Sequence, residues 1–181
     1  VDFGDAPQSY HTTLDPVGTA DGPLHRLVPN VFLGGNVDAE TNGVPTADAR
    51  GDDIAFGQNS FGQVLATSDE DGVNLDFWRD NLNNIQPNKF FPGGVSHIQV
   101  HANVPGYLNA WIDYNRDGDF NDVNEQIASS YALGAGANTL TLSLPLDAVV
   151  GTSYARFRFT TDSRPLAPDG IYDHNVIPDG E

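Results

Sequence analysis

Apolar and polar residues alternate along four stretches in the second half of the chain, as expected for strands with one buried face. In residues 153–161 the inward set would be Ala155, Phe157, Phe159 and Thr161. The same alternation runs through Val95–Ala102, Tyr107–Tyr114 and Thr139–Leu144, with turn sequences such as Val104-Pro105-Gly106 between them. This pattern predicts an all-β fold, an antiparallel β-sandwich with little helix.

The first half of the chain, about 90 residues, shows little sustained periodicity. Shorter strands are expected at Asn30–Leu33, Gln63–Ala66 and Gly72–Leu75, and one short helix near Phe77–Leu82. Neither an internal repeat nor a low-complexity linker divides the sequence, so we expect a single domain over residues 1–181. Because the chain lacks Met, we expect that it is excised from a longer polypeptide.

The composition adds a strong negative charge. The formal net charge is −17, all but four of the 25 acidic residues are Asp, and 19 Gly and 12 Pro accompany them. These residues favour turns over helix interiors, which argues against a helical bundle. The charge excludes nucleic acid and anionic membrane surfaces as partners and favours cations. Because cysteine is absent, disulfides and thiolate chemistry are excluded.

A calcium loop is the sharpest motif. Asp113-Tyr114-Asn115-Arg116-Asp117-Gly118-Asp119 spaces oxygen-bearing side chains at every second position and has Gly where a sharp turn is needed. The motif differs from an EF-hand in two ways: it follows an expected strand and not a helix, and the twelfth residue counted from Asp113 is Asn124, where an EF-hand has Glu. The candidate ligands are Asp113, Asn115, Asp117 and the Asp119 position, with Asp122 or Glu125 completing the set. The alternative is a solvated loop of Asx turns.

Further acidic groups precede this loop. They are Asp38-Ala39-Glu40, Gly51-Asp52-Asp53 and Asp69-Glu70-Asp71, with Asp2 and Asp5 upstream. Carboxylates this close repel one another unless a cation lies among them. We therefore expect several Ca²⁺ ions, which would also help to order a loop-rich segment whose entropy cost is high. Taken singly, each group could instead be a solvated charge run.

Other metal and catalytic chemistry has less support. His97 and His101 would lie about 13 Å apart on a strand, too far for one zinc ion. No nucleophile elbow or phosphate-binding loop is present, and the acidic residues have a better use as metal ligands than as a glycosidase pair. We expect a protein that is not an enzyme.

Aromatic and basic side chains on the outer sheet faces form a candidate ligand-binding set: Tyr107, Trp111, Tyr154, Arg156 and Arg158. The aromatic residues suit stacking on a sugar or a peptide side chain, and the arginines suit a carboxylate. Alternatively, the aromatic residues pack under a covering loop and the arginines pair with nearby acid.

The motifs occur in an order that resembles the GEVED-type domain of large bacterial surface proteins. The ordered set is Asp2-Phe3-Gly4-Asp5-Ala6-Pro7, the three acidic groups, Trp111–Phe120 and Arg156-Phe157-Arg158-Phe159, and the sequence stops at Asp179-Gly180-Glu181. Within that group the chain is similar to the peptide-binding domain of calcium-dependent RTX adhesins.

This resemblance implies a monomeric, calcium-loaded β-sandwich on the bacterial cell surface, where it serves adhesion and biofilm formation. It implies that the domain captures the C-terminal peptide of a protein on another cell, with Ca²⁺ coordinating the terminal carboxylate. Such an ion would supply the positive centre that a chain of this charge needs to hold an anionic peptide end. A calcium-dependent lectin and a calcium-stiffened spacer remain the alternatives.

Overall fold

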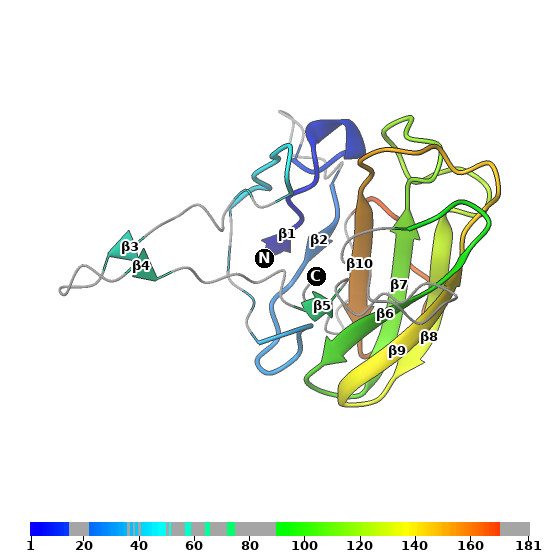
Figure 1. Cartoon of the computed structure of the whole chain (residues 1–181). Coiled ribbons are helices and arrows are strands. Elements are labelled where there is room, and N and C mark those ends of the chain that lie inside the picture. The colour runs from blue at the N-terminus through cyan, green and yellow to red at the C-terminus, as the bar shows by residue number, and fades with distance from the viewer. Residues whose placement is uncertain are drawn as a thin grey trace.

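The computed structural model describes residues 1–14, 22–35, 37, 39, 41–49, 51, 57–58, 64–65, 72–74 and 90–170, with only the backbone described at 57–58 and 64–65. Its elements, in chain order, are β1 (Asp2–Phe3), the 3₁₀ helix η1 (Gln8–Tyr10), β2 (Leu24–His25), β3 (Gly57–Gln58), β4 (Val64–Leu65), β5 (Val73–Asn74), β6 (Val95–Ala102), β7 (Gly106–Ile112), β8 (Gln126–Leu133), β9 (Gly136–Ser143) and β10 (Ala155–Thr160) (Figure 1). The prediction of an all-β fold with little helix is confirmed.

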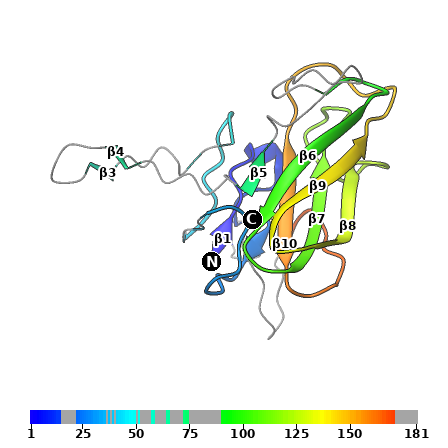
Figure 2. The same ribbon diagram turned by 60° about the horizontal axis from the view of Figure 1, so that its bottom comes forward.

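Two three-stranded antiparallel sheets build the sandwich. One has the order β5-β6-β9 and the other β10-β7-β8, and two small sheets pair β1 with β2 and β3 with β4. Figure 2 shows β6 and β9 lying across the sheet of β7, β8 and β10. The connections β6–β7, β8–β9 and β9–β10 each pass from one large sheet to the other, whereas β7 and β8 form a hairpin within one sheet.

The core lies between the two large sheets. Ile98, Val100, Leu140 and Leu142 from one sheet share a buried cluster with Leu108, Ala110, Ile112 and Phe159 from the other. Gly106, at the start of β7, lies so close to the Phe159 ring that an added Cβ would come within 2.5 Å of it. The period-two alternation of these four strands therefore marks the sandwich interior, as predicted, except that Ala155 and Thr161, which were expected to point inward, are exposed at the two ends of the β10 segment.

The predicted strands are found with small differences. Val95–Ala102 is confirmed to the residue, and the other three strands lie within one to three residues of their expected ends. Short strands at 64–65 and 73–74 are confirmed, whereas Val31 and Leu33 make isolated bridges and no strand. The expected helix at 77–82 lies outside the described residues. Pattern analysis missed β8, which pairs with β7 through a bulged register.

The outer faces of the two sheets differ in exposure. On β6 the residues that point away from the core, such as His97 and His101, are exposed. On the other sheet, the outer face is covered by the N-terminal segment around η1 and by residues 166–170, and a second buried cluster forms there from Ala6, Tyr10, Trp111, Phe120 and Leu166. The described part of the chain contains no helix long and apolar enough to cross a membrane.

Candidate functional site

The acidic motif forms the hairpin loop between β7 and β8. β7 ends at Ile112 and β8 begins at Gln126, so residues 113–125 make up the whole connection. The Ile112 N–H donates to the Glu125 carbonyl at 2.9 Å and closes the base of the loop. The candidate loop therefore lies at a strand end, as its spacing and the strand pattern before it predicted.

Two carboxylates are buried at the base of this loop. Asp113 is 0% exposed and Glu125 is 1% exposed. Asp113 accepts hydrogen bonds from the Gly118 N–H at 3.2 Å and from the Arg116 N–H, and Glu125 accepts from the N–H groups of Tyr114 and Asp122 at 3.1 and 3.2 Å. Within the described residues neither carboxylate forms an ion pair. The site thus holds two buried anionic groups with neutral donors only.

The electrostatics of Glu125 reflect this burial. Loss of solvent raises the pKa of the Glu125 carboxyl, and the negative charges of Asp113 and Asp117 raise it further. The two backbone N–H donors act in the opposite direction but do not cancel the effect. A cation at the loop would stabilise the ionised form and reverse this shift.

Three exposed side chains converge above the buried pair. The Asn115 amide nitrogen donates to the carboxylates of Asp117, at 2.9 Å, and Asp122. This amide contact is also the main cause that lowers the pKa of Asp117. Because Asn115 presents an oxygen as well as a nitrogen, the three residues supply the oxygen ligands that Ca²⁺ prefers.

The remaining predicted ligand position, Asp119, is joined to this group through its backbone, because its N–H donates to the Asp117 carboxylate at 3.3 Å. Its carboxylate accepts the Asn121 N–H at 2.8 Å, so it caps the local turn. In the part of the chain that is described, no three His, Asp or Glu side chains already form a cluster that could hold a metal. The donor chemistry of Asp113, Asn115, Asp117, Asp122 and Glu125 fits calcium, and calcium binding stays a prediction.

An N-terminal tyrosine, which the sequence pattern did not single out, completes the base of the loop. The Tyr10 hydroxyl donates to the buried Asp113 carboxylate at 2.6 Å, and its ring lies 4.8 Å from that of Phe120. Burial and this hydrogen bond raise the pKa of Tyr10. Beside it, Ser9 approaches Gly118, whose φ of +97° is favourable only for glycine. The N-terminal segment is therefore docked on the loop.

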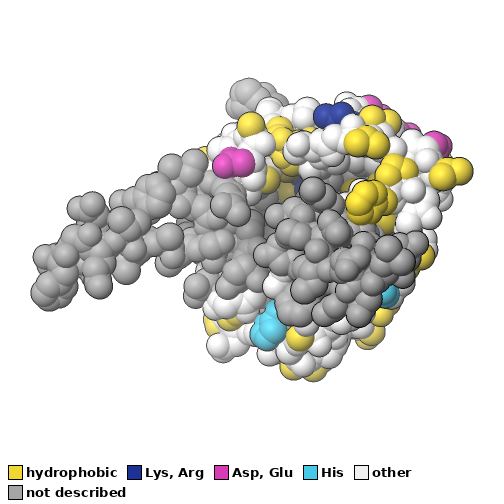
Figure 3. Space-filling model, in the orientation of Figure 1, with side chains coloured by type: hydrophobic (Ala, Val, Ile, Leu, Met, Phe, Trp, Pro, Cys, Tyr) yellow, Lys and Arg dark blue, Asp and Glu magenta, His cyan; other side chains and the backbone are white. Residues whose placement is uncertain are grey.

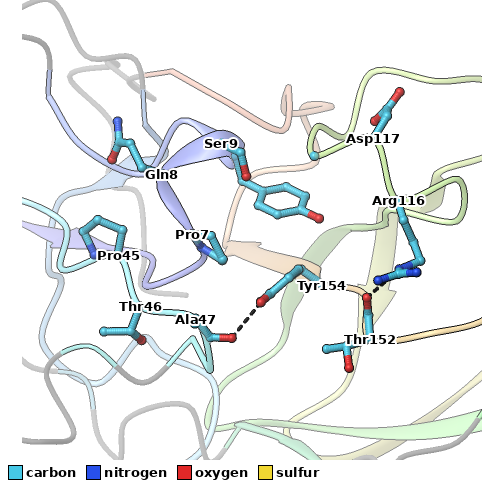
Figure 4. Close-up of a pocket in the computed structure, with 12 residues that line it drawn as sticks. Pro7, Gln8, Ser9, Pro45, Thr46, Ala47, Arg116, Asp117, Thr152 and Tyr154 are labelled. Carbon is cyan, nitrogen blue, oxygen red and sulfur yellow. Dashed lines mark hydrogen bonds between the residues drawn. The ribbon is translucent and has the colours of Figure 1, made fainter.

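A hollow of about 560 Å³ lies where these two segments meet. Its wall is formed by η1 and its neighbours, the segment 45–47, the loop tip, and the residues before β10: Pro7, Gln8, Ser9, Tyr10, Pro45, Thr46, Ala47, Arg116, Asp117, Gly118, Thr152 and Tyr154. Figure 4 shows Pro7 and Tyr154 at its centre, with Arg116 and Asp117 on one side. The Tyr154 hydroxyl donates to the Ala47 carbonyl at 2.6 Å and joins the two sides.

A second hollow, of about 660 Å³, lies at the end of the sandwich near Phe91, Leu144 and Val149. Its lining is mainly apolar, and Asp113, whose carboxylate is occupied by the hydrogen bonds above, is its only charged residue in the described lining. The first hollow, with charged groups on its wall, is therefore the better candidate for a polar ligand.

The predicted aromatic and basic ligand set is mostly buried. Trp111 is 2% exposed, and Arg156 and Arg158 are also buried, so these three do not form an exposed stripe. Arg156 donates to the Tyr10 carbonyl and pairs with Asp169 at 3.1 Å, and Arg158 donates to His25 and the Ala167 carbonyl. The alternative of packing and internal pairing is the one found. Tyr107 is half-buried, and Tyr154 lines the first hollow.

The upstream acidic residues have separate positions. Asp2 lies in β1 opposite His25, and the Asp5 carbonyl accepts the Thr46 N–H at 3.0 Å; both side chains are buried. The other predicted ligands, Asp38, Glu40, Asp52, Asp53, Asp69 and Asp71, lie outside the described residues. His97 and His101 are exposed on β6, as expected for residues on the outer face of a strand.

Comparison with known proteins gives one match. The family model of the GEVED domain matches residues 107–181, which run from the second residue of β7 to the end of the chain and include the whole acidic loop. The match confirms the resemblance for this part, and the motifs before Tyr107 lie outside it. No curated protein and no solved structure matches the chain.

Proposed function

We propose that the chain, whose residues 107–181 match the family model of the GEVED domain, is a calcium-dependent binding module of a bacterial cell-surface adhesin. In this proposal it is not an enzyme, and it captures the C-terminal peptide of a protein on another cell. The observation that carries the proposal is the pair of buried carboxylates, Asp113 and Glu125, which share one loop and have no cationic partner in the described part of the chain.

Calcium accounts for this arrangement better than a solvated loop does. Burying a carboxylate costs several kcal/mol unless a positive charge or a full set of hydrogen bonds compensates it. Here each carboxylate has backbone or hydroxyl donors, but the two lie close enough for the charge of Asp113 to raise the pKa of Glu125. An ion ligated by Asp113, Asn115, Asp117, Asp122 and Glu125 would remove that repulsion.

Further ions at the N-terminal acidic groups are part of the same proposal. With a formal charge of −17, the chain gains stability whenever a divalent ion neutralises neighbouring carboxylates. An ion with an open coordination position would supply a positive centre for the carboxylate of a peptide end. The hollow beside the loop, with Asp117 on its wall, offers space for the last residues of such a peptide.

The test compares peptides that differ only at the end. A panel of peptides with free C-terminal carboxylates, and the same panel with amidated ends, is immobilised and exposed to the domain in calcium and in EGTA. We expect calcium-dependent binding of a subset of the free-acid peptides and loss of that binding on amidation. Equal binding of acid and amidated forms would refute the peptide-end proposal. Binding to a glycan array that free sugar competes would favour a lectin, and no ligand on either array would favour a spacer.

A further inference from the structure

The wall of the hollow carries a positive charge that is not neutralised within the described residues. The Arg116 side chain is exposed, and it donates from Nε to the Thr152 carbonyl at 2.8 Å and from Nη1 to the Val150 carbonyl at 3.3 Å. Both acceptors are uncharged. By contrast, Arg156 and Arg164 pair with Asp169 and Asp162. An arginine without a carboxylate partner is unexpected in an acidic loop of a chain with 25 acidic residues and only eight basic ones.

The backbone and its neighbours fix the position of this arginine. Arg116 has a φ of +62°, in the left-handed region that non-glycine residues seldom adopt. The Arg116 N–H donates to the Asp113 carboxylate, and the Asp117 N–H donates to the Asn115 side-chain oxygen at 2.9 Å. The guanidinium lies against Gly151, where an added Cβ would come within 2.5 Å of Nη1. The charge is therefore held in place on the wall of the hollow.

We infer that Arg116 and this hollow form the subsite that binds a carboxylate of the ligand. The inference rests on the proposed function, because it takes the ligand to be a peptide end. A guanidinium presents five N–H donors, and the bonds to Thr152 and Val150 use only two, so others remain for a carboxylate. The charge is complementary: the guanidinium attracts an anionic ligand at short range, against the repulsion from the acidic chain as a whole.

The rest of the wall fits a short peptide. Pro7, Pro45 and the Tyr154 ring offer apolar surface at the same hollow. Figure 3 shows a basic patch at the upper edge of the molecule, near hydrophobic and acidic side chains. Asp117 would oppose an anion here, but in the proposed function its charge is offset by calcium. Arg116 thus lies between Asn115 and Asp117 in the sequence, which are two proposed calcium-coordinating residues, and it borders the hollow proposed for the peptide.

The experiment uses small probes on the whole chain labelled with ¹⁵N. N-acetylglycylglycine, its C-terminal amide and methyl glucuronide are titrated in calcium, and the Arg116 Nε–Hε signal and the amides of Thr46 and Gly118 are followed. We expect the free acid to shift these signals and the amide to leave them unchanged. Equal shifts with the acid and the amide would overturn the carboxylate subsite, and equal shifts with the sugar acid and the peptide acid would overturn its assignment to a peptide end.

Two charge-matched variants complete the test. Arg116→Gln should raise the dissociation constant of the free acid by roughly tenfold or more, because it removes a charge-assisted hydrogen bond. Arg26→Gln removes one positive charge at an exposed site that does not line the hollow, and it should change that constant by less than about twofold because salt screens distant charges. If calcium raises the melting temperature of Arg116→Gln as much as that of the parent, the loop of the variant is intact.

The two proposals fail in different ways. If binding needs calcium and a free carboxylate but Arg116→Gln behaves like Arg26→Gln, the Arg116 subsite is wrong and the proposed function stands. If acid-specific shifts persist unchanged in EGTA and disappear in Arg116→Gln, the subsite stands and the calcium part of the proposed function is wrong.

Discussion

Replacing Glu125 by Gln tests whether the buried carboxylate serves a metal, because the calcium-free and calcium-bound proteins should respond differently. Glu125 accepts two backbone N–H groups, whereas the amide oxygen of Gln can take only one of these positions. Losing one hydrogen bond costs about 1 kcal/mol. Removal of a charge that burial disfavours offsets this cost, so without calcium the free energy of unfolding should change by less than about 1 kcal/mol.

In calcium the same substitution should be clearly destabilising. An ion at 100 times its dissociation constant stabilises the folded state by about 2.7 kcal/mol. If a neutral amide ligand weakens the site about a hundredfold, the stabilisation falls to about 0.4 kcal/mol. The calcium-dependent increment should therefore shrink by roughly 2 kcal/mol, which for a domain of this size corresponds to a melting temperature lower by roughly 4 to 8 °C.

The assay is thermal unfolding of both proteins, each in calcium and in EGTA, followed by circular dichroism. Asp147→Asn is the control, because Asp147 is exposed and lies outside the loop while the variant also removes one negative charge. It should keep the full calcium increment. Calcium binding by Glu125 is refuted if Glu125→Gln keeps the same increment, or if the parent melts at the same temperature with and without calcium.

Two further predictions concern the same loop. Tyr10→Phe removes a buried hydrogen bond to a carboxylate, so it should destabilise the domain by about 1.5 to 3 kcal/mol in urea unfolding, whereas Tyr131→Phe at a 47% exposed site should change little; a Tyr10→Phe variant as stable as the parent would contradict this. Because the folded state raises the pKa of Glu125 and so binds its proton more tightly than the unfolded chain, the calcium-free parent should gain stability relative to Glu125→Gln as the pH falls through that raised pKa. Parallel stability curves for the two proteins between neutral and mildly acidic pH would refute the shift.

Alternation predicted four long strands correctly because each has one face in the core and no irregularity in its own pattern. The strand β8 was not predicted because its buried residues Ala128 and Leu133 are five positions apart in the sequence, whereas residues on one face of a regular strand are an even number of positions apart. The register shifts between β7 and β8 explain how both residues still reach the core. Local pattern analysis cannot anticipate a bulge that depends on the partner strand.

The candidate site also has features that the sequence predicted and features that it did not. The spacing of oxygen side chains from Asp113 to Glu125 follows from the order of residues, and the expected position at a strand end was correct. The burial of Trp111 could not be predicted from the strand pattern. Alternation shows that Trp111 lies on the outer face of β7, but it does not show whether other segments of the chain cover that face. Contact between Tyr10 and Asp113 joins residues 103 positions apart, a separation at which no spacing rule operates.

By itself, then, the sequence determined the β-rich class, the four regular strands and the donor atoms of the acidic loop, because these depend on residue type and short-range periodicity. Only the tertiary structure decided which carboxylates are buried, that the N-terminal segment covers the sheet of β7, β8 and β10, and that Arg116 borders a hollow without a carboxylate partner in the described residues. These features depend on solvent exclusion and on charges brought together by folding, and both are properties of segments that are distant along the chain.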